Sequence, residues 1–113
     1  MSKITIGDFS IGEDEPCFTI AEAGANHDGN LEQALKLIDA AKESNVSSIK
    51  FQTYKANKIA SKESRAYWDT SKEKTKSQLE LFSKFDKFNF KDYKILSIYC
   101  KKLKIDFLST PFD

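Results

Sequence analysis

The residues of this chain that could do chemistry are polar side chains near the carboxyl ends of three apolar runs. Glu22 closes a run at 17–23, Lys50 and Gln52 belong to a run at 46–53, and Thr110 follows a run at 105–109. Barrels and open parallel sheets bind their ligands at the carboxyl ends of strands. Ionisable and hydrogen-bonding groups at this position favour a catalytic or ligand-binding site over a purely structural sheet.

Each of these residues also has a structural interpretation. Glu22 and Lys50 could pair simply because isolated charges do not stay buried unpaired. Lys50 could also extend from an edge strand with its ammonium in water. Either residue alone is as consistent with structure as with function, but together on adjacent strands they favour function.

A polar loop, Asn26-His27-Asp28-Gly29, follows the first run. A loop histidine is as often a turn or surface residue as a functional one. A single histidine cannot make a metal site, and the chain contains only one.

The elements that must position these residues alternate in type. Weak alternation around Gly7 predicts a hairpin over 4–11, and the three apolar runs predict strands, the first of them buried on both faces. Helices are predicted over 30–45, with Asn30 as cap and Asn45 as stop, and over 89–103. A capping pattern beginning at Thr75 predicts a further helix.

The connection at 54–74 is polar, dotted with aromatic residues and too long for a routine loop, which is typical of lids and binding loops. We expect Pro111 to stop the third strand and to hold Thr110 extended. The order of strand, helix, strand, helical pair and strand is typical of βαβ units. The fold class is therefore α/β with a parallel sheet.

Composition sets limits on the class of protein. The 113 residues suffice for one domain, with 40% hydrophobic and 31% charged residues and a formal net charge of +1. Basic residues are scattered among acids, so no nucleic acid is expected as a partner. No long apolar run predicts a membrane span or a secretion signal. Two isolated cysteines, Cys17 and Cys100, indicate a reducing cytoplasm without disulfides, and we expect both to be buried.

Three ordered motifs resemble the sialic acid synthase family: IAEAGANHDGN at 20–30, SIKFQTYKA at 48–56 and FLSTPFD at 107–113. The segments between them are similar too, so the resemblance covers nearly the whole chain. That family makes N-acetylneuraminate and its relatives legionaminate and pseudaminate. The resemblance implies a (β/α)8 TIM barrel in which phosphoenolpyruvate condenses with the open-chain aldehyde of an N-acetylated amino sugar, such as N-acetylmannosamine, and phosphate is released.

The resemblance also implies roles for individual residues. Lys50 and Thr110 would hold the phosphate and carboxylate of phosphoenolpyruvate. Glu22 would be the catalytic residue, placing a water or moving a proton. Gln52 would lie near the sugar or the metal, and Asn26 and His27 would line the site.

The resemblance concerns only part of the family's protein. We expect residues 1–113 to be the N-terminal portion of the barrel, its first three βα units preceded by the hairpin. The family's divalent metal, Mn or Mg, would have its ligands outside this chain. The family's C-terminal antifreeze-like domain would also lie outside it, and the full-length protein is expected to be a homodimer. We expect the chain alone to be inactive.

Two other functions fit the same residues. A related phosphoenolpyruvate-condensing aldolase for another sugar is the nearest alternative. A small non-catalytic α/β module that binds a ligand or partner is the alternative from a different class, and it would have to pair its open strand edges.

Overall fold

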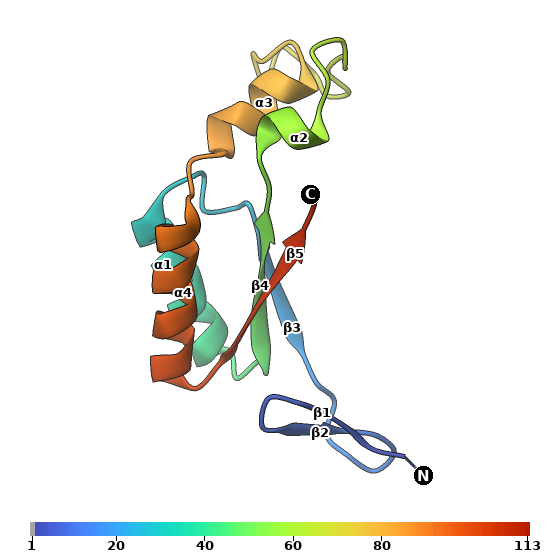
Figure 1. Cartoon of the computed structure of the whole chain (residues 1–113), viewed down its shortest axis with the longest axis vertical. Helices are drawn as coiled ribbons and strands as arrows, with labels where there is room; N and C mark the ends of the chain where they lie inside the picture. The colour runs from blue at the N-terminus through green and yellow to red at the C-terminus, as the bar shows by residue number, and fades with distance from the viewer. Residues whose placement is uncertain (1) are drawn as a thin grey trace.

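The computed structural model describes residues 2–113 and contains a three-stranded parallel sheet in the order β3-β4-β5. The strands are β3 (Ile20–Gly24), β4 (Ser48–Thr53) and β5 (Asp106–Pro111). The helices α1 (Leu31–Glu43) and α4 (Phe90–Leu103) lie side by side on one side of it (Figure 1). The predicted parallel, sequential order is confirmed.

The two long helices begin where the sequence predicts. The Asn30 side chain accepts a hydrogen bond from the backbone N–H of Gln33, 3.0 Å away. Asn89 forms a full capping box with Asp92 at the start of α4. Such caps satisfy backbone donors that the helix itself cannot pair. The predicted stop at Asn45 is confirmed, since this residue is left-handed (φ 57°) directly after the helix.

The core lies between the sheet and these two helices. Its largest fully buried apolar side chains are those of Ile38, Ile49, Phe51, Leu96 and Cys100. The opposite face of the sheet carries no helix, and Ile20 in β3 is 48% exposed. The prediction of a first strand buried on both faces is therefore wrong for this chain, because nothing in residues 2–113 packs on that side.

Several predicted boundaries also shift. The first strand starts at Ile20 rather than at residue 17. The helix α3 (Gln78–Phe85) is capped by Ser77 and not by Thr75, which instead donates to Glu73. Pro111 does not lie beyond the end of β5, as the sequence predicts. It is itself the last residue of that strand, in register with Thr53. At a strand end, the missing N–H of proline costs no ladder bond.

The segment 54–74 is not wholly irregular. It contains a short helix, α2 (Ala56–Ile59), which lies with α3 above the carboxyl end of the sheet (Figure 1). We call residues 54–88, which include both helices, the cap segment. It covers the end of the sheet at which the predicted site residues lie.

The predicted hairpin is confirmed as the antiparallel pair β1 (Ile4–Ile6) and β2 (Phe9–Ile11), turning at Gly7 (φ +53°). It lies below the amino ends of the parallel strands (Figure 1). Gly7 lies so close to the Asp106 carboxylate that an added Cβ would be 2.6 Å from one oxygen. Within residues 2–113 no helix is long and apolar enough to cross a membrane.

Candidate active site

Glu22 and Lys50 face each other on adjacent parallel strands. They are register partners in β3 and β4, and the Lys50 ammonium lies 3.3 Å from a Glu22 carboxylate oxygen. The side chains are 35% exposed for Lys50 and 51% exposed for Glu22. Ion pairs this open to water contribute little to stability, so a bound anion could compete for the ammonium at small cost.

Gln52 and Thr110 continue the same face toward the carboxyl end. They are register partners in β4 and β5, one pleat repeat beyond the pairing of Lys50 with Leu108. Because side chains alternate along a strand, Lys50 and Gln52 project to one side and Phe51 to the other. The four predicted polar residues Glu22, Lys50, Gln52 and Thr110 therefore share one face at one end of the sheet.

Gly24 interrupts the regular pleat of β3. The register shifts between Glu22 and Gly24, and the backbone of Gly24 is left-handed (φ +55°). A Cβ at this position would lie 3.4 Å from a Glu22 carboxylate oxygen and 3.6 Å from the Gln52 side-chain nitrogen. The absent side chain leaves open the space between the carboxylate and the amide. The chain leaves the strand for the following turn at this irregularity.

His27 lies away from these residues. Its ring is 3% exposed and stacks on Phe88, with the ring of Phe51 6.1 Å away. Its Nδ1 accepts a hydrogen bond from the backbone N–H of Gly29, and its buried Nε2 has no partner among residues 2–113. Burial lowers the pKa of His27, and the nearby Asp28 carboxylate offsets part of that effect. Asn26 is exposed in the same turn.

Asp86, which no sequence pattern singles out, fixes the cap segment to the end of β4. Its carboxylate accepts hydrogen bonds from the Lys55 ammonium at 3.0 Å and from the Ala56 backbone N–H at 2.9 Å. Lys55 also donates to the carbonyl of Phe88. The end of α3 thus holds the beginning of α2 over the strand ends.

The cap segment and the strand ends enclose an apolar cavity of about 220 Å³. The residues at the strand ends are Ala25, Gln52 and Phe112, and Ile59, Leu81, Phe82 and Phe85 come from the cap segment. Tyr54 lines it as well, and burial followed by the nearby Asp86 carboxylate raises its pKa, so the phenol is uncharged. The aromatic content of this segment is visible in the sequence, but the convergence of these side chains is not.

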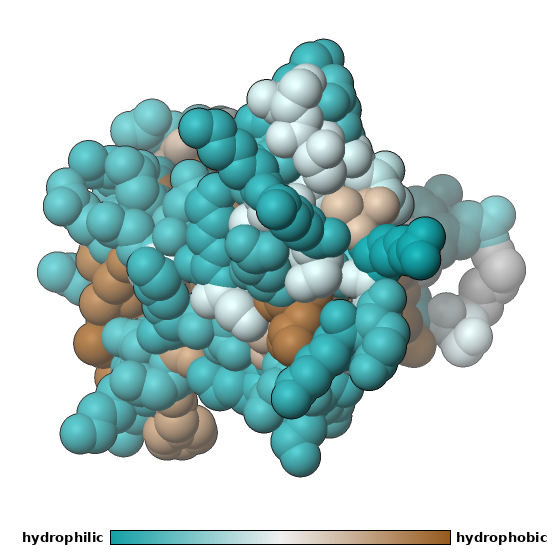
Figure 2. All heavy atoms as spheres, turned by 90° about the horizontal axis from the view of Figure 1, so that it is seen from above, coloured by the Kyte–Doolittle hydropathy of each residue, from teal (hydrophilic) through white to brown (hydrophobic). Residues whose placement is uncertain are grey.

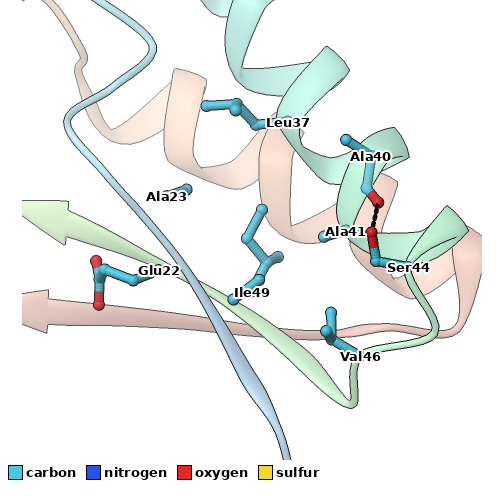
Figure 3. A pocket seen from close by; sticks show the side chains of 9 residues that line it. Glu22, Ala23, Leu37, Ala40, Ala41, Ser44, Val46 and Ile49 are labelled. Carbon is cyan, nitrogen blue, oxygen red and sulfur yellow. Dashed lines mark hydrogen bonds between the residues drawn. The ribbon is translucent and has the colours of Figure 1, made fainter.

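A second cavity, of about 290 Å³, lies between α1 and the free edge of β3. Leu37, Ala41 and Ile49 converge there, while the Glu22 carboxylate points away from them (Figure 3). Ser44 donates a hydrogen bond to the Ala40 carbonyl at its rim. This cavity belongs to the contact between helix and sheet rather than to the polar face.

The described part of the chain does not fit a divalent metal ion by itself. No three histidine, cysteine, aspartate or glutamate side chains converge anywhere in residues 2–113. The Nδ1 of His27 is already occupied as an acceptor.

Both cysteines are free, but only one is buried as expected. Burial raises the pKa of the Cys100 thiol to about 12, so it packs as a small apolar side chain. Cys17 is exposed in the segment that precedes β3. The expectation of burial is wrong for Cys17.

Comparison with known proteins identifies a family. The model of the NeuB family matches residues 37–113. Spore coat polysaccharide biosynthesis protein SpsE of Bacillus subtilis is 36% identical over 115 residues, covering all of this chain and 30% of that protein. N,N'-diacetyllegionaminic acid synthase of Legionella pneumophila is 38% identical, covering 90% of this chain and 29% of that protein.

Solved structures agree with the sequence comparison. The crystal structure of N-acetylneuraminic acid (sialic acid) synthetase from Leptospira borgpetersenii matches 99% of this chain with a TM-score of 0.77 and 33% identity. The match covers 35% of that structure. The chain thus spans about a third of the length of the proteins it resembles.

Proposed function

The chain belongs to the NeuB family, and on that premise we propose that it carries the phosphoenolpyruvate-binding end of a nonulosonic acid synthase. In the proposed reaction, the methylene carbon of phosphoenolpyruvate bonds to the aldehyde carbon of an N-acetylated amino sugar. Water adds to the adjacent carbon, and phosphate leaves. The names of the relatives from Legionella and Leptospira support a nine-carbon sugar-acid product.

The observation that carries the proposal is the solvated pair of Glu22 and Lys50 at the carboxyl ends of adjacent strands. Lys50 offers a compact positive charge and Thr110 a hydroxyl donor for the phosphate and carboxylate of phosphoenolpyruvate. When the anion binds the Lys50 ammonium, the Glu22 carboxylate loses its ion-pair partner. It can then orient the attacking water or accept a proton from it.

Gln52 contacts the acceptor sugar in this proposal, since it lies beyond Lys50 on the same face. Asn26 belongs to the turn that borders the site. His27 supports this turn rather than the substrate itself. Its buried ring packs against Phe88, and its Nδ1 accepts a hydrogen bond from the backbone N–H of Gly29.

We further propose that β3, β4 and β5 are the first three strands of a (β/α)8 barrel and that the chain is the N-terminal portion of the synthase. The matched structure supports this, as does the uncovered polar face, which becomes the barrel interior when further strands close around it. The divalent metal, Mn or Mg, takes its ligands from outside residues 2–113. The assembled protein is a cytoplasmic homodimer.

The experiment measures phosphate release from phosphoenolpyruvate with N-acetylmannosamine and manganese. The polypeptide encoded by the complete reading frame should turn over, and the 113-residue chain should not. Turnover of other aldoses without turnover of any N-acetylated amino sugar would favour the rival aldolase. A complete polypeptide that neither binds nor consumes phosphoenolpyruvate would refute the proposal.

A further inference from the structure

The helix layer carries an apolar groove on its surface, between α1 and α4. The volume of this groove is about 240 Å³, and the residues that line it are Leu35 from α1 and Ile95, Ile98, Tyr99 and Lys102 from α4. On the side where these two helices lie, apolar atoms reach the surface among hydrophilic ones (left in Figure 2). We call this hollow the helix groove.

The isoleucines of the helix groove are not part of the core. Ile95 is 43% exposed and Ile98 is 58% exposed, whereas the buried face of α4 is formed by Leu96 and Cys100. Neighbouring apolar side chains that remain in water are typical of a surface that another molecule covers. Because α1 and α4 also share the packed core, the groove between them is present before a partner binds.

The groove is flanked by positive charge that has no partner within the described chain. Helix α4 contains four lysines against a single acid, Asp92, which is engaged in the capping box, although the chain as a whole has a net charge of only +1. Residues three or four apart are neighbours on a helix, so Lys91, Ile95, Ile98 and Lys102 form one row with a lysine at each end. The ion pairs within residues 2–113 use other lysines.

One acidic side chain lies close to this row. The Asp39 carboxylate of α1 accepts a hydrogen bond from the Tyr99 hydroxyl, so it is directed to the contact between the two helices. Glu32 on α1 pairs with Lys36 of the same helix. The lysines of α4 therefore remain available to an external acid.

Shape and charge together define the occupant. A flat lipid surface does not reach into a hollow between two helices. A second copy that packed on this face by two-fold symmetry would bring the lysines of α4 close to one another. Further elements of the proposed barrel would join at the outer edges of β3 and β5, beside this helix pair rather than over it.

We propose that the helix groove docks an acidic amphipathic helix of another protein. Apolar side chains of that helix, three or four residues apart, enter the hollow between Leu35 and the two isoleucines. Its acidic side chains, one turn away on either side, pair with Lys91 and Lys102. This inference goes beyond the proposed reaction, because the groove lies on the helix side of the sheet and the pair of Glu22 and Lys50 on the other.

The test measures fluorescence anisotropy of a labelled synthetic peptide titrated with the 113-residue chain. The peptide is a helix of about 18 residues, with leucines three and four residues apart and with glutamates flanking them. It should bind with a Kd on the order of 100 μM or tighter, and binding should weaken as salt is added. A peptide with glutamine in place of every glutamate should bind about 10-fold more weakly.

Variants locate the binding on the groove. Ile98→Ala should weaken binding of the acidic peptide about 5- to 10-fold, since it removes apolar contact area from an exposed position. Lys102→Gln should weaken it about two- to fivefold and should not change binding of the glutamine peptide. Phe90→Leu and Lys72→Gln are the matched controls, because both residues are exposed outside the groove, and they should leave the affinity unchanged.

Three outcomes would overturn the inference. The first is equal binding of the acidic peptide and the glutamine peptide, or an affinity that Ile98→Ala leaves intact. The second is binding to vesicles of phosphatidylglycerol, lost in Ile98→Ala, without binding to the acidic peptide, which would make the groove a lipid-binding surface. The third is a lower average mass of Ile98→Ala in sedimentation, which would show that a second copy occupies the groove.

Discussion

The imidazole of His27 stacks on the ring of Phe88, with centroids 4.2 Å apart and planes 11° from parallel. This contact takes the histidine out of water and leaves its Nε2 without a partner among residues 2–113. A charged imidazolium in that position would lose hydration, and the nearby Asp28 carboxylate would offset only part of that loss. The chain therefore holds its single histidine neutral.

This burial makes stability depend on pH. The pKa of His27 is lowered in the folded chain, so between its usual value of 6.5 and the folded value the unfolded state binds more protons. The free energy of unfolding should have its full value at a pH above the usual pKa of histidine. It should decrease as the pH falls below that pKa. Urea melts between about pH 7.5 and pH 5 would show this slope. His27→Phe should remove it, and an unchanged slope in that variant would contradict the assignment.

Lys50→Met should weaken anion binding while barely changing stability. Loss of a charge-assisted contact should weaken phosphoenolpyruvate binding about 10- to 100-fold, whereas the solvated pair with Glu22 stabilises the fold little. Calorimetric titration with phosphoenolpyruvate and urea melts measure the two effects. Lys36→Met removes a similar exposed ion pair, with Glu32 on α1, and should leave binding unchanged. Equal loss of binding in both variants would mean that Lys50 acts only through net charge.

Gly7→Ala should destabilise the chain by about 1–2 kcal/mol. The new methyl would sit in a left-handed residue and meet the Asp106 carboxylate, whose Oδ2 is already buried without a partner among residues 2–113. Gly12→Ala is the control, because its Cβ would come closest to the flexible Lys3 side chain, 3.1 Å from the Lys3 Cγ, and its φ is not positive. Thermal melts that give the same shift for both variants would show that the hairpin does not pack on Asp106.

Asp86→Ala should loosen the cap segment. The 13%-exposed carboxylate is the partner of a partly buried backbone N–H at Ala56, and its removal should cost about 1–3 kcal/mol. Hydrogen exchange should accelerate in α2 and α3 more than in α1. Asp69→Ala offers a control, since that carboxylate is on the surface and its side chain bonds to Ser71. Uniform acceleration across all helices would instead point to global destabilisation.

The 113-residue chain should associate with itself. The outer edges of β3 and β5 have no strand partner among residues 2–113, and Ile20 is exposed on the uncovered face. Unpaired strand edges beside apolar surface favour pairing with another chain. Sedimentation at several concentrations should show a rising average mass. A monomer with a melting transition independent of concentration would show that the chain is a complete domain.

Local signals in the sequence determined most of the elements. The caps at Asn30 and Asn89 and the stop at Asn45 each act within a few residues, so their sequence patterns define where helices begin and end. The alternation of Lys50 and Gln52 with Ile49 and Phe51 is equally local, and it suffices to place the polar residues on one face of the strand. The family resemblance supplied the roles that spacing alone left open.

Only the tertiary structure decided what lies opposite each residue. The register that puts Glu22 beside Lys50, and Gln52 beside Thr110, comes from the pairing of separate strands. The burial of His27 against Phe88 joins residues 61 positions apart, for which no local pattern exists. The cavity under the cap segment likewise depends on Asp86 holding α2 over the strand ends. Short-range patterns fix conformation, but contacts between distant segments depend on how whole elements pack, which no single stretch of sequence encodes.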